Sequence, residues 1–161
     1  MFAESLTGLQ EFAPVAALRG SRWSYAGVNA AHIAGFALLV GAIVPLDLRL
    51  MGWRRTIPIG VLARVLLPVA IGGLVLAIVA GLLLFSTRAT EYAALTLFQL
   101  KIALVVCGVV NAVLLHRAAA WEAEQETVGA MPPPRLRLAG ALSIALWLSV
   151  LTCGRMLAFI D

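Results

Sequence analysis

Four long apolar runs separated by short polar segments dominate the sequence. They cover residues 27–46, 65–85, 93–115 and 138–160, and each is close to the ~20 residues with which a helix crosses a bilayer. A continuous apolar run of that length predicts a membrane helix whatever its internal period. Because the connections are short, the pattern predicts an all-α integral membrane protein. We expect a single domain over residues 1–161, folded as a four-helix up-down bundle.

Two segments outside these runs also carry a pattern. Leu6, Leu9, Phe12 and Ala16 recur at helical spacing, which predicts a short helix over residues 3–18 lying on the membrane surface. The longest connection, residues 118–137, contains three glutamates and a run of three prolines. We expect this connection to be a solvated loop that ends the helix before the fourth run.

Composition removes several classes of protein. The chain is 62% hydrophobic and only 12% charged, whereas soluble domains are roughly half apolar and about a quarter charged. A soluble globule, a disordered tail and a secreted disulfide scaffold are therefore excluded. The net charge is +4, but the basic residues are scattered between apolar runs rather than clustered on one solvated face. We therefore expect no nucleic-acid partner.

The basic residues indicate an orientation. Seven arginines flank the two connections that follow the first and third runs, and four lie on the opposite side. The seven are Arg49, Arg54, Arg55, Arg64, Arg117, Arg135 and Arg137, and the four are Arg19, Arg22, Arg88 and Arg155. Because Lys and Arg favour the cytoplasmic side, we expect both termini outside and the two basic connections in the cytoplasm.

Polar residues inside the spans are the candidates for function. An ionisable residue at the centre of a membrane helix costs roughly 2.5–3.5 kcal/mol on insertion scales. His32, Lys101, Arg155 and Asn29 all fall in the outer third of their spans, so we expect them to form one interior cluster. Its two cations suit an anion such as a haem propionate, a lipid headgroup or an anionic small molecule. A second polar layer at the inner ends contains Asp47, Arg49, Arg64, Asn111 and His116.

Each candidate also has a plain structural interpretation. His32 can be a core residue with satisfied hydrogen bonds, or a cofactor ligand whose tautomer is fixed by Asn29 one helical turn away. His116 can be an interfacial side chain, and Lys101 can extend toward the outer surface. Asp47 can form a structural ion pair with Arg49 or Arg64.

Two histidines in a four-span bundle suggest b-type haem, with His32 and His116 as iron ligands. However, the two residues differ in height by roughly 20 Å or more at ~1.5 Å per residue, so one iron cannot bind both. A haem on His32 would need Met156 or Lys101 as its second ligand, and a haem on His116 would need an inner residue such as Met51.

The chain resembles a widespread group of small four-span bacterial membrane proteins of unknown function. The resemblance rests on Trp23-Ser-Tyr, His32-Ile-Ala-Gly, Asp47-Leu-Arg-Leu-Met-Gly, Leu97-Phe-Gln-Leu-Lys, Gly108-Val-Val-Asn, His116-Arg and Trp147…Gly154-Arg. It also has a looser likeness to the bacterial four-span cytochrome b561 proteins, which implies quinone-linked electron transfer through two b haems. That family uses four histidine ligands and this chain has two, so the likeness implies one haem here or a haem in a partner subunit.

Two functions follow from these observations. The first is a small electron-transfer protein, or the membrane subunit of a redox complex, that binds haem b and exchanges electrons with quinone. In that case Asn29, His32, Lys101, Asn111, His116 and Arg155 are the candidate cofactor-binding residues. The second is an accessory or transport subunit that packs against larger membrane partners or a second copy of the chain. An optical spectrum of the oxidised and reduced protein distinguishes them.

Overall fold

Helices make up nearly all of the structure. It is a computed structural model that describes residues 7–8 and 10–159. The helices are α2 (Ala13–Gly20), α3 (Arg22–Leu50), α4 (Ile59–Thr87), α5 (Ala89–Ala94), α6 (Thr96–His116), α7 (Ala119–Glu124) and α8 (Pro134–Leu157). Helices α3, α4, α6 and α8 are long and apolar enough to cross a membrane. The prediction of an all-helical, multi-pass membrane protein is confirmed at this level.

Each predicted span lies largely within one long helix, but the helices begin and end at other residues. Helix α3 begins five residues early because the Ser21 hydroxyl accepts a hydrogen bond from the Ser24 amide at 3.3 Å, as an N-cap does. Helix α8 begins at Pro134, the last residue of the proline run, since proline is tolerated in the first turn. Apolar runs mark the part of a helix that lies in hydrocarbon, whereas caps and prolines mark where the helix itself starts and stops.

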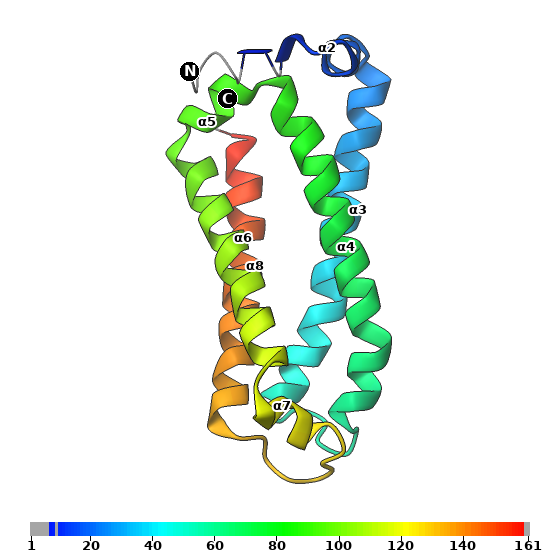
Figure 1. The fold of residues 1–161 in the computed structure, drawn as a ribbon, viewed down its shortest axis with the longest axis vertical. Coiled ribbons are helices and arrows are strands. Elements are labelled where there is room, and N and C mark those ends of the chain that lie inside the picture. Colours follow the sequence, from blue (N-terminus) through cyan, green and yellow to red (C-terminus); the bar gives the residue numbers. More distant parts are fainter. Residues whose placement is uncertain (1–6, 9, 160–161) are drawn as a thin grey trace.

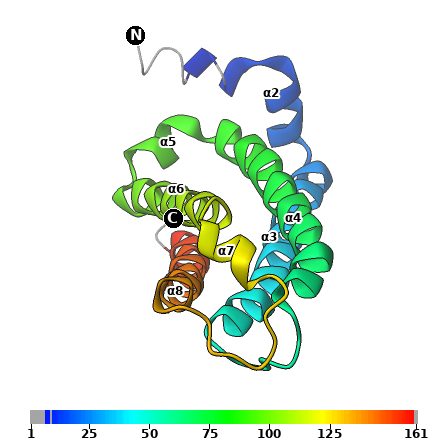
Figure 2. The same cartoon turned by 60° about the horizontal axis from the view of Figure 1, so that its bottom comes forward.

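The four long helices alternate in direction and form an array that is open on one side (Figures 1 and 2). Helix α3 packs against α4 along most of its length, α6 packs against α8, and α3 also contacts α8. Among the described residues, α4 and α6 barely approach each other. We call the line between these two helices the α4–α6 seam, and the two ends of the array the α2 end and the α7 end (Figure 1).

Helices α3 and α4 cross at two glycines. A Cβ atom on Gly35 would lie 2.6 Å from the backbone nitrogen of Ala77, and one on Gly73 would lie 2.6 Å from the carbonyl oxygen of Gly35. Only glycine allows the two backbones to come this close, and such small residues are typical of membrane helix contacts. The crossing fixes the position of α4 relative to His32, one turn before Gly35.

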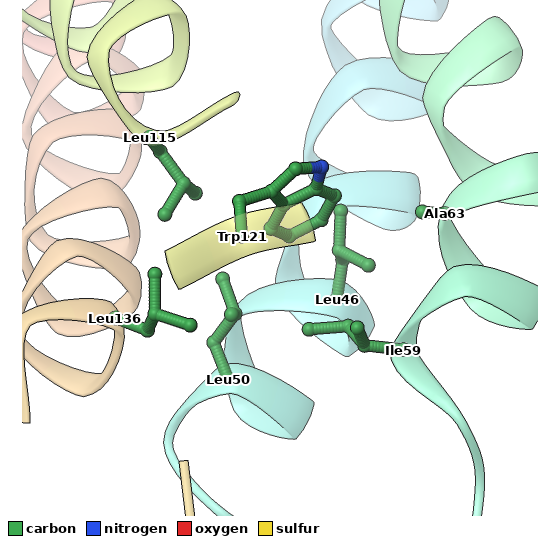
Figure 3. Close-up of a cluster of buried hydrophobic side chains, with 7 residues drawn as sticks. All are labelled: Leu46, Leu50, Ile59, Ala63, Leu115, Trp121 and Leu136. Atoms are coloured by element: carbon green, nitrogen blue, oxygen red, sulfur yellow. The ribbon is translucent and has the colours of Figure 1, made fainter. Parts of the chain in front are cut away.

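The segment between α6 and α8 is only partly the solvated loop that the sequence predicts, since many of its residues are exposed but a few are buried. It contains α7, whose Trp121 is buried with Leu46, Leu50, Ile59, Ala63, Leu115 and Leu136 from all four long helices (Figure 3). Trp121 keeps only 4% of its surface exposed. The glutamates suggested a solvated segment, but burial of one large indole outweighs that preference. The segment therefore closes the α7 end of the array.

The predicted N-terminal helix is interrupted at Phe12, and residues 7–8 and 10–11 before it are also helical. Of the predicted residues 3–18, residues 3–6 and 9 lie outside the described part of the chain. Helix α2 starts after Phe12, which has an extended ψ of 126°. The cause is Pro14, which is tolerated in the first turn of a helix but not in its interior. Val15 is the buried residue of α2, and α2 packs on both α3 and α4.

Candidate functional site

A cavity of about 640 Å³ lies in the half of the array nearer the α2 end. Helices α3, α4, α5, α6 and α8 all contribute to its lining, which is mostly apolar and rich in aromatic rings. Its polar members are Tyr25, Asn29, His32, Tyr92 and Lys101. Ligand sites in proteins commonly combine an apolar cavity of ~300–1,000 Å³ with a few polar groups. We call this space the α4–α6 cavity.

His32 lines the cavity and uses one of its two ring nitrogens in a hydrogen bond within the protein. Its Nδ1 lies 2.7 Å from the carbonyl oxygen of Ala77 on α4. A carbonyl only accepts, so Nδ1 carries the hydrogen and Nε2 of the neutral ring has a free lone pair. Nothing in the described part of the chain forms a hydrogen bond with Nε2. The ring lies against Gly81, where a Cβ would be 3.0 Å from its Cε1 atom.

Lys101 brings a hydrogen-bond donor to the same cavity from α6. Its ammonium lies against Gly154 of α8, where a Cβ would be 3.4 Å from Nζ. Within the described residues, no hydrogen bond or ion pair holds this ammonium. Such a half-buried cation is costly in a membrane protein unless something pairs with it.

Aromatic side chains enclose the two polar groups. At the α2 end, Phe85 of α4 stacks on Phe98 of α6 with ring centroids 5.2 Å apart, and Tyr92 of α5 lies 5.8 Å from Phe98. Toward the α7 end, Phe36 meets the edge of Trp147 at 6.4 Å. A flat ring held between these side chains would lie against aromatic faces while its polar atoms reach His32 and Lys101.

Three of the four residues predicted as an outer cluster share this cavity, and the fourth does not. His32, Asn29 and Lys101 all line it, whereas Arg155 lies outside with its guanidinium 4.9 Å from the Phe159 ring. Arg155 is near the end of α8 and its long side chain reaches past the last turn, as a cation near a membrane surface does. The predicted role of Asn29 also needs correction, because the Ala77 carbonyl and not Asn29 fixes the tautomer of His32.

The other two predicted site residues are packing residues at the α7 half. The Nδ1 of His116 donates to the Ala112 carbonyl at 2.7 Å, and its ring lies 4.5 Å from that of Trp121. Asn111 donates from Nδ2 to the Ala139 carbonyl at 3.1 Å and so ties α6 to α8. His116 and His32 lie in opposite halves of the array, so these two side chains do not meet at one iron.

The predicted ion pair of Asp47 is absent from the described structure. Arg49 is fully buried and donates to the carbonyls of Ile57 at 2.6 Å and Thr127 at 3.1 Å, and it lies 4.0 Å from a carboxylate oxygen of Glu124. Asp47 instead interacts with Ser143 of α8. Residues two apart on a helix point about 200° apart, so Asp47 and Arg49 face different neighbours.

The described residues include no group of three or more His, Cys, Asp or Glu side chains placed to hold a metal ion. Haem needs fewer protein ligands, and Nε2 of His32 has the free lone pair that haem iron would take. Lys101 is the second candidate ligand that lines the cavity, whereas Met156 does not line it. The residues present therefore fit at most one haem.

Sequence reasoning missed the aromatic and glycine members of the site. Phe85, Tyr92 and Phe98 come from three different helices, and Gly81 is one of several glycines within the second apolar run. Their spacing along the chain carries no signal for a shared cavity. Only the arrangement of α4, α5 and α6 around the seam brings them together.

Comparison with protein-family models, curated proteins and solved structures finds no match to this chain. The resemblance to small four-span bacterial proteins and the likeness to cytochrome b561 therefore stay predictions.

Proposed function

We propose that this protein is a quinone-binding membrane subunit of an electron-transfer system, with the quinone head group held between His32 and Lys101. One observation carries the proposal. A hydrogen-bond acceptor, Nε2 of His32, and a donor, the Lys101 ammonium, belong to residues that line the same aromatic cavity, and neither has a partner in the described structure. A buried polar group without a hydrogen bond costs about 1–3 kcal/mol. A ligand that pairs with both groups offsets that cost.

The chemistry of a quinone matches the two groups. A quinol hydroxyl can donate to Nε2 of His32, while the oxygen at the other side of the ring accepts from the Lys101 ammonium. The aromatic walls accept the flat ring, and the apolar lining excludes water-soluble anions of similar size. When the bound quinol is oxidised to quinone, its two electrons pass to a redox centre of a larger membrane partner and its two protons to solvent, while this chain supplies the quinone site.

A haem b on His32 is the second candidate, with one observation in its favour. Histidines that bind metals commonly donate their other ring nitrogen to a backbone carbonyl, and the His32–Ala77 hydrogen bond has that form. When bound, haem would supply one-electron transfer. Lys101 would then serve as its second ligand or pair with a propionate.

The proposal includes a location. The four apolar helices suit the bacterial cytoplasmic membrane as an up-down bundle, with both termini and the α4–α6 cavity on the periplasmic side. Helix α2 then lies at the periplasmic surface of the cytoplasmic membrane. The exposed Phe12 and Trp23 belong to an aromatic belt there.

The test uses the protein purified in a mild detergent without added ligand. Solvent extraction and mass spectrometry should find close to one isoprenoid quinone per chain, and the optical spectrum should stay featureless when dithionite is added. A reduced b-type spectrum without quinone would assign the cavity to haem. Absence of both would contradict the redox proposal and favour an accessory or transport subunit.

A further inference from the structure

The α4–α6 seam is the apolar opening of the cavity. Ile78 and Leu82 of α4 and Ile102 of α6 line the cavity and are also 43%, 61% and 46% exposed, respectively. Among the described residues few pairs from the two helices come close, although Phe85 and Phe98 stack across the seam about one turn nearer the α2 end. A side chain that both lines a cavity and is exposed marks its rim, so the rim on this side consists of hydrocarbon groups.

The other sides of the cavity are closed or polar. Toward the α7 end its lining ends on Leu39, Trp147 and Val150, which are each 3% exposed or less. On the α3 side, the lining residues His32, Phe36 and Leu39 are half-buried or buried. At the α2 end the lining includes the polar residues Tyr25 and Asn29 together with the stacked aromatic rings.

We propose that the α4–α6 seam is a lateral portal through which the hydrocarbon tail of the ligand extends into the bilayer. The inference rests on the proposed function and narrows its substrate class to quinones with a long isoprenoid tail. The ligand enters from the lipid, places its head group at His32 and Lys101, and leaves its tail between Ile78 and Ile102. A closed cavity of about 640 Å³ would have to contain the whole tail, whereas a portal leaves the tail in lipid.

A double variant that narrows the portal tests this directly. Ile78→Phe with Ile102→Phe enlarges one rim residue on each of the two helices. Val79→Phe with Val106→Phe is the matched control, because these valines are 53% and 55% exposed and do not line the cavity. Both variants are placed in lipid nanodiscs, and binding is followed by quenching of tryptophan fluorescence. The probes are a decyl-substituted benzoquinone and the same ring without a tail.

We expect the portal variant to slow association of the tailed quinone at least tenfold and to change that of the tail-less ring less than twofold. The control should behave as wild type with both. Equal slowing of both probes, or no slowing of either, would overturn the portal while leaving the proposed function in place. If wild type binds neither probe, the proposed function fails and the portal with it.

A second measurement needs no substitution. A quinone with a photoreactive group at the end of its tail is bound to the wild-type protein and irradiated. Labelled peptides from α4 around Ile71–Ile78 or α6 around Ile102–Val110 support the portal. Labels confined to α2 or the start of α3 would place the tail at the α2 end and overturn it.

Discussion

Polar side chains have different surroundings in the two halves of the array. At the α7 end, Arg49 is fully buried and donates to two backbone carbonyls, and Trp121 fills the space between all four long helices. At the α2 end, His32 and Lys101 face a cavity of about 640 Å³. Polar atoms without a partner occur in both halves of the described structure, but those of Arg49, Asp47, Glu124 and His116 at the α7 half are enclosed by protein.

This difference separates a structural role from a binding role. An enclosed polar atom has no room for a ligand, whereas Nε2 of His32 opens onto a space that a ring can occupy. The α7 half therefore holds the helices in register, and the α2 half keeps a site open between them. Substitutions should reduce stability most in the first half and binding most in the second.

The largest loss of stability is expected for Arg49→Met. Removing the guanidinium leaves two carbonyls and the 6% exposed Glu124 without their partner, and breaking a buried pair in this way costs about 3–5 kcal/mol. Unfolding by SDS titration measures the effect. The exposed neighbour Arg54→Met is the control and should change stability by less than about 0.5 kcal/mol. A loss below about 1 kcal/mol for Arg49→Met would contradict the structural role of the α7 end.

Gly73→Ala should have the next largest effect, because it forces α3 and α4 apart. The new methyl would lie 2.6 Å from backbone atoms of Gly35 and Leu39, and overpacking of this kind costs about 1–3 kcal/mol. The neighbouring Gly72 has nothing within 4 Å of its Cβ position. Gly72→Ala should therefore leave stability unchanged or slightly higher in the same titration, and equal effects at the two glycines would disprove the crossing.

Lys101→Met should separate binding from stability. It removes a half-buried ammonium that holds no partner in the described structure, so stability should stay the same or rise by up to about 1–3 kcal/mol. Loss of the hydrogen bond to the ligand should weaken quinone binding roughly tenfold, which corresponds to about 1.4 kcal/mol. Arg155→Met, which removes a cation outside the cavity, should leave the dissociation constant unchanged. A variant that lost stability but kept binding would place Lys101 among the packing residues.

The spans and part of the site could be predicted from the sequence. A bilayer demands apolar runs of ~20 residues, so the four spans are visible without any structure. The rise of a helix also puts His32 and Lys101 at similar depth, and the cavity contains both. Helix α7 could not be predicted, because its six residues are held by tertiary burial of Trp121. The sequence also could not show that Arg155 lies outside the cavity, because its flexible side chain can reach in several directions. Nor could it show the α4–α6 seam, because the sequence does not say which pairs of helices pack against each other.

The central claim is that His32, and not His116, binds the ligand. Titration of the decyl-substituted benzoquinone into wild type, His32→Gln and His116→Gln tests it directly, with quenching of tryptophan fluorescence as the signal because Trp147 lines the cavity. We expect saturable binding to wild type, a dissociation constant at least tenfold higher for His32→Gln, and an unchanged one for His116→Gln. Equal binding by all three proteins, or a larger loss for His116→Gln, would contradict the account.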